Sequence, residues 1–163
     1  MTEQEKRLHR CCFTGHRPEK LKRSEKETTS ALREAIADAI DAGFTTFISG
    51  MARGVDIWAA EQVIEFRKTN PGIHLIAAIP HPYFEKRWPA EWQARYRRII
   101  EAANLVKTVC PSFSMGSYQA RNEWMVDHSA RLIAVYNGAA GGTRNTIEYA
   151  KRVGIQAICL ISC

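Results

Sequence analysis

The sequence of 163 residues lacks the features that mark membrane and secreted proteins. Its longest uncharged apolar run, around residues 74–82, is far shorter than the roughly 20 residues that a membrane-spanning helix needs. The N-terminus, MTEQEKRLHR, has no apolar stretch before a cleavage site, so we expect no signal peptide. The expected location is therefore cytoplasmic, with no membrane partner.

Cysteine is too scarce and too irregularly spaced for a zinc site or a disulfide scaffold. The five cysteines are odd in number, and no two have C-x-x-C spacing. Cys11, Cys12, Cys110 and Cys159 lie in or beside apolar runs that we expect to be buried strands. We therefore expect them to pack as small hydrophobic side chains, and we expect neither a metal nor a cofactor.

Acidic residues are in the minority, with 17 against 23 lysines and arginines, which gives a net charge of +6. The excess lies in two segments. Residues 1–28 hold eight basic and five acidic residues, and residues 82–107 hold six and three. Such a balance favours anionic ligands, but a charge of this size does not by itself establish nucleic-acid binding.

Short apolar, β-rich runs alternate with helical patterns along the whole chain. Strands are expected at residues 8–13, 44–48, 74–79, 105–110, 132–136 and 155–161. Helices are expected at residues 24–42, after the turn at 49–56 through 68, and at 90–103, 117–128 and 143–153. This α/β alternation predicts one Rossmann-like domain over residues 1–163, a three-layer α/β/α sandwich with a mainly parallel sheet and central strand order 3-2-1-4-5.

Ligands of such sheets bind at the carboxyl ends of the strands, near the switch point, here expected between the first and fourth strands. One loop there contains Gly141, Gly142 and Thr143 immediately before a helix. Glycines let the backbone approach a phosphate, and the free N–H groups of the helix start favour an anion. A tight turn without ligand is the alternative, since neither a G-x-G-x-x-G nor a Walker pattern is present.

Two further loops supply polar candidates at the same edge. The first strand is followed by Gly15, His16 and Arg17, and the guanidinium of Arg17 suits a phosphate or carboxylate, while His16 suits a ribose or phosphate. The second strand is followed by four candidates, Ser49, Gly50, Gly54 and Asp56. Asp56 either caps the following helix or contacts a ligand.

Arg121 and Glu123 lie in the first turns of the helix after the fourth strand. We expect Arg121 to bind the charged part of a ligand. Glu123 is expected to orient Arg121 or to accept a hydrogen bond from a ribose hydroxyl. The alternative is that both residues belong to a solvated helix face. Trp88, Trp92 and Tyr96 recur every four residues, which favours core packing over stacking on nucleic-acid bases.

Three segments together resemble the SLOG superfamily, a Rossmann-like group that includes DNA-processing protein A (DprA) and the LOG phosphoribohydrolases. Residues 49–56, SGMARGVD, look like the SG-x-A-x-G-(I/V)-D segment of DprA-like proteins. Residues 141–150, GGTRNTIEYA, look like their GG-T-x-x-T-x-x-A segment. Residues 13–21, FTGHRPEKL, and the short length resemble the YpsA-like branch of small bacterial proteins.

The resemblance implies a pocket for a nucleotide or nucleotide derivative. LOG enzymes cleave the N-glycosidic bond of nucleoside monophosphates with an Arg, which corresponds to Arg121, and a Glu in their PGG-x-GT-x-x-E segment. The position of that Glu is Thr146 in this chain, which carries no carboxylate. We therefore expect poor hydrolysis, with Thr146 donating a hydrogen bond to ligand or backbone.

Three functions follow from these patterns. The first is a nucleotide-binding or sensing domain without efficient catalysis. The second is a LOG-like phosphoribohydrolase with Arg121 and Glu123 as catalytic candidates, and the third is DprA-like binding of single-stranded DNA through the basic segments. A nucleotide-derived small molecule is the expected partner, and self-association into a homo-oligomer stays open.

Overall fold

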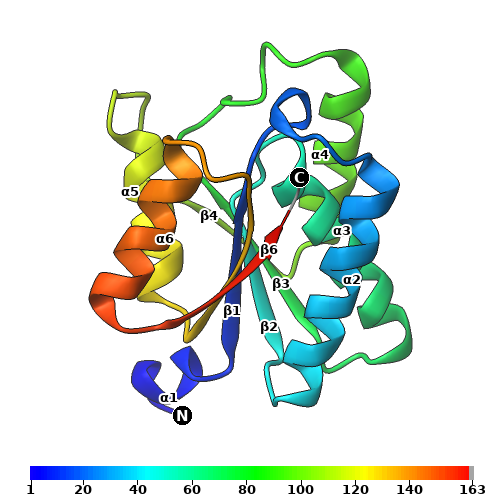
Figure 1. The fold of residues 1–163 in the computed structure, drawn as a ribbon, viewed down its shortest axis with the longest axis vertical. Coiled ribbons are helices and arrows are strands. Elements are labelled where there is room, and N and C mark those ends of the chain that lie inside the picture. Colours follow the sequence, from blue (N-terminus) through cyan, green and yellow to red (C-terminus); the bar gives the residue numbers. More distant parts are fainter. Residues whose placement is uncertain (162–163) are drawn as a thin grey trace.

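The computed structural model describes residues 1–161, and within them six parallel strands form one sheet between two layers of helices (Figure 1). The strands are β1 (Arg10–Gly15), β2 (Thr46–Ser49), β3 (His74–Ile79), β4 (Leu105–Thr108), β5 (Arg131–Tyr136) and β6 (Gln156–Ile161). The helices are α1 (Glu3–Arg7), α2 (Glu25–Asp41), α3 (Val55–Thr69), α4 (Ala90–Ala102), α5 (Ser117–Asp127) and α6 (Gly142–Val153), with the 3-10 helix η1 at Pro18–Lys20.

Each face of the sheet carries its own hydrophobic core. Helices α2, α3 and α4 cover one face, and α5 and α6 cover the other (Figure 1). Successive residues of β1 alternate between the two cores: Cys11 and Phe13 pack on the first face, and Cys12 packs on the second. Burial on both faces explains why the central strands are unbroken apolar runs, and the three-layer α/β prediction is confirmed.

The predicted strand order 3-2-1-4-5 is wrong in its second half. The observed order is β4-β3-β2-β1-β5-β6, so the fourth strand extends the sheet beyond β3 and the fifth strand pairs with β1. The chain winds outward from β1 to β4 and returns across the other face through α5. The switch point consequently lies between β1 and β5 rather than between the first and fourth strands.

Local signals placed most helix ends correctly. The Ser24 hydroxyl accepts from the backbone N–H of Glu27, whose side chain accepts from the Ser24 N–H, and this capping box starts α2 where the helix over residues 24–42 was predicted. Gly154 ends α6 in the left-handed region, with φ +87°. Ser117 starts the helix predicted at 117–128, but it does not cap α5: Gly116 is the N-cap residue, and the Ser117 hydroxyl donates to the carbonyl of Ser114.

Some side chains are more exposed than the sequence predicts. Cys11 and Cys12 are buried, Cys110 is half-buried, and Cys159 is exposed because β6 is an edge strand; Cys163 lies outside the described residues. Strand β4, on the opposite edge, is exposed along its length. Trp92 and Tyr96 are buried against the first core, so the aromatic stripe of α4 packs inward as predicted.

Candidate functional site

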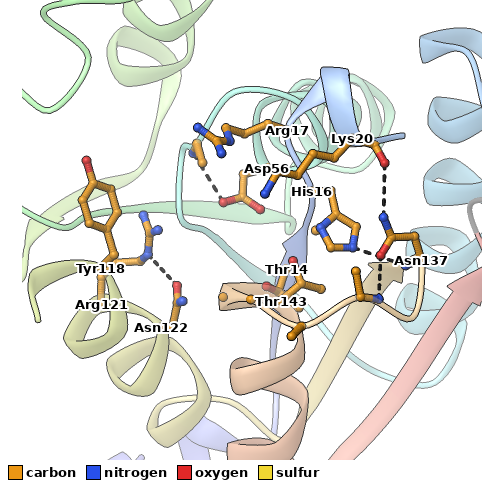
Figure 2. Close-up of a pocket in the computed structure, with 16 residues that line it drawn as sticks. Thr14, His16, Arg17, Lys20, Asp56, Tyr118, Arg121, Asn122, Asn137 and Thr143 are labelled. Carbon is orange, nitrogen blue, oxygen red and sulfur yellow. Dashed lines mark hydrogen bonds between the residues drawn. The ribbon is translucent and has the colours of Figure 1, made fainter. Parts of the chain in front are cut away.

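A cavity of about 220 Å³ opens at the carboxyl ends of β1 and β5, at the switch point of the sheet. Loops from four places in the chain meet there, as Figure 2 shows. Eight of the thirteen residues singled out from the sequence line it: Gly15, His16, Arg17, Asp56, Arg121, Gly141, Gly142 and Thr143. These residues reach the cavity from the ends of strands and the loops after them, or from the first two turns of a helix.

The start of α6 presents unpartnered backbone N–H groups to this cavity. Gly141 is the N-cap residue and no side chain caps the helix. The first intrahelical bond runs from the N–H of Asn145 to the carbonyl of Gly141, so the N–H groups of the preceding turn have no helical acceptor. A Cβ at Gly142 would meet no atom within 4 Å, because the space in front of it belongs to the cavity. The helix start is therefore built to receive an anion.

His16 is held as a neutral hydrogen-bond donor. Its Nε2 accepts from the backbone N–H of Asn137 at 3.2 Å, and its ring stacks on Tyr136 at 6.0 Å. Burial, together with the charge of Lys20, lowers the pKa of His16. In the neutral ring with Nε2 as acceptor, the proton lies on Nδ1, which is left to donate to a ligand (Figure 2).

Arg17 and Lys20 add two positive charges on the solvent side of the cavity. Both side chains are exposed, and among the described residues neither forms an ion pair. The side chain of Asn137 donates to the carbonyl of Lys20 at 3.2 Å and so ties η1 to the loop after β5. The two cations are positioned by the backbone while their charges remain available to an anion.

Arg121 and Asp56 form the buried side of the cavity. Arg121 is 4% exposed; its Nε donates to the side chain of Asn122 at 2.8 Å, and its Nη1 donates to the carbonyl of Gly50. Its guanidinium also lies 5.8 Å from the ring centre of Tyr118. Burial lowers the pKa of Arg121, and the nearby Asp56 carboxylate opposes that shift.

Asp56 is the single carboxylate that lines the cavity, and it is 5% exposed. Its Oδ2 accepts from the N–H of Ala52 at 3.3 Å, whereas its buried Oδ1 has no partner within residues 1–161. Burial raises the pKa of Asp56 to about 6, against the lowering effect of Arg121. The unpartnered oxygen is an acceptor for a hydroxyl group of a ligand.

Two of the predicted glycines serve close packing rather than ligand contact. A Cβ at Gly50 would lie 2.9 Å from Oδ2 of Asp56 and 3.0 Å from Cζ of Arg121. Gly54 has φ +91°, and a Cβ there would lie 2.7 Å from the carbonyl oxygen of His16. Glycine at these positions lets the loop after β2 approach both β1 and α5, which brings the charged groups together.

Three other predicted residues lie outside the cavity. Ser49 is buried, and its hydroxyl donates to the carbonyl of Asp56 at 2.8 Å and so braces the loop. Glu123 accepts from the side chain of Gln119 at 3.0 Å. Thr146 is fully buried and donates to the carbonyl of Gly142 at 2.8 Å, so of its two expected partners it uses the backbone.

Sequence reasoning missed half of the cavity wall. The residues it did not single out are Thr14, Lys20, Ala52, Tyr118, Asn122, Asn137, Ala139 and Ala140. Two of them could have been identified from the sequence. Asn137 directly follows the predicted fifth strand, at the edge where ligands bind. Tyr118 precedes Arg121 by about one helical turn and therefore lies on the same face of α5.

The described part of the chain contains neither a cluster of metal-ligating side chains nor a helix that could span a membrane. Within residues 1–161 no three His, Cys, Asp or Glu side chains gather in a way that could hold a metal ion. No helix described there is long and apolar enough to cross a membrane. The charged and polar groups around the cavity include three cations, one carboxylate, one imidazole and the start of α6.

Two relatives resemble this chain in sequence. The SPbeta prophage-derived protein YoqJ of Bacillus subtilis is 36% identical over 118 residues, which cover 65% of this chain and 69% of YoqJ. A UPF0398 protein of Halalkalibacterium halodurans is 31% identical over 125 residues, covering 75% of this chain and 66% of that protein.

Solved structures of DprA share the fold. The protein from Streptococcus pneumoniae superimposes with a TM-score of 0.66 at 16% identity, over 93% of this chain and 50% of that one. The protein from Helicobacter pylori gives a TM-score of 0.62 at 19% identity, over 96% and 66%. This chain thus spans half of the pneumococcal protein, and at these identities the likeness shows the fold alone.

A family model supplies the assignment. The model described as "YspA SLOG family" matches residues 11–156, which include every residue of the cavity wall. The SLOG resemblance of the three motif segments is thereby confirmed, and this chain belongs to the YpsA (YspA SLOG) family.

Proposed function

We propose that this protein binds a nucleotide or nucleotide derivative through its phosphate and sugar, without efficient cleavage of the ligand. The observation that carries the proposal is the convergence of Arg17, Lys20 and Arg121 with the uncapped start of α6 on one cavity. Charge-assisted hydrogen bonds to phosphate are among the strongest that a protein forms. Three cations and a single carboxylate line the cavity, so its net charge is positive and attracts an anion.

The remaining polar groups suit the sugar. The unpartnered Oδ1 of Asp56 can accept a hydrogen bond from a ribose hydroxyl, and Nδ1 of His16 can donate one to a sugar or phosphate oxygen. A carboxylate binding a hydroxyl pair is a common way to recognise ribose in Rossmann-like sites. Because Asp56 and His16 can bind a sugar in addition to the phosphate, the site favours a ribonucleotide over inorganic phosphate.

Hydrolysis of the LOG kind has little support at this site. Thr146 stands where those enzymes have a Glu, is fully buried and bonds to the backbone. Glu123 does not line the cavity. Neither position places a carboxylate in the cavity, and Asp56, the one carboxylate that lines it, is assigned to the ribose hydroxyls. A developing oxocarbenium charge therefore lacks the partner that the Glu of LOG enzymes supplies, a loss that typically costs ~10²–10³ in rate.

Single-stranded DNA is the second candidate, and the structural neighbours favour it. The H. pylori DprA structure is described as showing a single-stranded DNA binding mode, and its fold matches 96% of this chain. The same cations that bind a nucleotide phosphate would then contact a strand. A salt dependence steeper than contact with the three cavity cations accounts for would favour this candidate over a small-molecule site.

Gly142→Val tests the proposed site. The new side chain enters open space, so the fold is retained, but it occupies the place of the phosphate. Titration calorimetry with AMP should show at least about tenfold weaker binding, since one charge-assisted hydrogen bond is worth ~1.5–3 kcal/mol. Gly72→Val, at the opposite end of the sheet, is the matched control and should bind AMP normally.

Two results would overturn the proposal. Unchanged AMP affinity in Gly142→Val would remove the start of α6 from the site. Release of free adenine by the wild type at ordinary enzymatic rates would replace a binding domain with a hydrolase.

A further inference from the structure

Aromatic rings gather at the carboxyl ends of β3 and β4, beside the cavity. His81 follows β3, Phe113 lies in the loop after β4, and Tyr118 is in the first turn of α5. The rings of Phe113 and Tyr118 meet His81 edge-on, with centroid distances of 5.2 and 5.8 Å. Phe113 is 63% exposed and Tyr118 42% exposed, so both rings offer surface to a ligand.

His81, which contacts both rings, has one ring nitrogen without a hydrogen-bond partner in the described residues. Only 8% of it is exposed, and its Nδ1 lies 3.0 Å from the carbonyl oxygen of Pro82. A carbonyl can only accept, so Nδ1 donates and Nε2 is the acceptor in the neutral ring. Nε2 is buried and has no hydrogen-bond partner within residues 1–161. Burying such an acceptor costs free energy, which a ligand N–H group would recover.

This aromatic cluster is continuous with the cavity. Tyr118 belongs to both, because it lines the cavity and also contacts His81. The guanidinium of Arg121 also lies near the Tyr118 ring, 5.8 Å from its centre (Figure 2). A ligand whose anionic end lies in the cavity can therefore extend past Tyr118 towards His81 and Phe113.

We propose that Phe113, Tyr118 and His81 form a subsite for an amino-bearing nucleobase of the ligand whose phosphate occupies the cavity. Phe113 and Tyr118 supply stacking surfaces, and Nε2 of His81 accepts from the exocyclic amine. Bases stack readily on aromatic side chains. An exocyclic amine on the edge of a base can donate the hydrogen bond that Nε2 of His81 does not receive within the described residues. This inference rests on the proposed function, since the cavity anchors the phosphate.

Calorimetry with ribose 5-phosphate and AMP separates the two proposals. AMP should bind wild type more tightly, and Phe113→Ala should weaken AMP binding at least about fivefold, the lower end of one stacking contact, and leave ribose 5-phosphate unaffected. Leu105→Ala, which changes an exposed apolar residue at the amino end of β4, away from the subsite at the carboxyl end, is the matched control. Failure of ribose 5-phosphate to bind overturns the proposed function, whereas equal affinities of the two ligands overturn the subsite alone.

The role of His81 is tested with purine riboside 5′-monophosphate, which lacks the exocyclic amine. Wild type should prefer AMP, and His81→Phe, which keeps an aromatic ring, should lose that preference. Equal binding of both ligands by wild type overturns the assignment without any variant. A 5′-phosphorylated deoxyadenylate tetramer that binds more tightly than AMP, with the same sensitivity to Phe113→Ala, identifies a strand as the source of the base.

Discussion

At the scale of single residues, the site depends on a charged pair that the fold keeps apart from solvent. Asp56 and Arg121 influence each other's pKa, yet they form no direct ion pair. Arg121 is bound instead to Asn122 and to the carbonyl of Gly50. A buried carboxylate with one free oxygen is expensive for folding, and such costs concentrate at functional sites.

Asp56 should therefore make the protein less stable as pH rises. Its pKa increases from 3.8 to about 6 on folding, so the native state holds the proton more tightly. Its stabilising contribution is complete below pH 3.8 and is lost as pH rises through about 6. The loss is at most about 3 kcal/mol for a shift of this size.

Asp56→Asn removes the titration of this carboxyl group and should flatten the pH dependence of the unfolding free energy between pH 3.8 and about 6. Denaturant unfolding of the wild type and of Asp56→Asn over a pH series gives the difference between their unfolding free energies. The other carboxylates contribute equally to both proteins, so their contributions cancel in that difference. A variant whose stability follows the wild-type curve would show that Asp56 is not the buried acid described here.

At the scale of elements, α6 shows how a helix divides residues between a site and a core. Thr143, Thr146, Ile147 and Ala150 recur at helical spacing and are buried against the sheet. Gly141 and Gly142, at the helix start, face the cavity. Position 146 consequently belongs to the packed face of α6, although the segment as a whole borders the site.

Thr146→Glu should therefore fail to create a hydrolase. The new carboxylate would be buried without a partner, which destabilises a protein by about 3–5 kcal/mol. Thermal unfolding and adenine release from AMP measure both consequences. Asn145→Glu, at an exposed position of the same helix, is the control and should stay close to wild-type stability. Substantial turnover by a well-folded Thr146→Glu would place that side chain in the cavity after all.

At the scale of the whole molecule, ion pairs neutralise part of the positive charge that gives the chain its net +6. Arg95, in the basic segment 82–107, pairs with Glu61 at 2.6 Å and with Glu25 at 3.1 Å. The cations of the cavity are not neutralised in this way. The charge of these three cations therefore remains available to a polyanion at the carboxyl end of the sheet.

Oligothymidylate binding, if it occurs through the cavity, should show a modest salt dependence. Contact with three cations predicts a slope of about −2 for log affinity against log salt on a single strand. Fluorescence anisotropy over a salt series measures that slope. A slope twice as steep would mean that the basic segments also contact the strand, as expected for a dedicated DNA-binding protein.

Local sequence signals determined which elements form and where their ends lie. Apolar runs buried on both faces, the capping box at Ser24 and the stop at Gly154 act within a few residues, so they can be read without a fold. Because parallel strands end at one edge, the same signals predicted that the loops after β1, β2 and β5 would carry the site.

Only the tertiary structure decided which strands are neighbours and which side chains face the cavity. Alternation fixes the direction of strands but not how many strands a crossover passes, so the packing of α5 and α6 on one face placed β5 beside β1. The same packing buried Thr146 and brought His81, Phe113 and Tyr118 into one cluster from separate loops. Contacts between residues so distant in sequence depend on the geometry of the whole sheet, which no local pattern encodes.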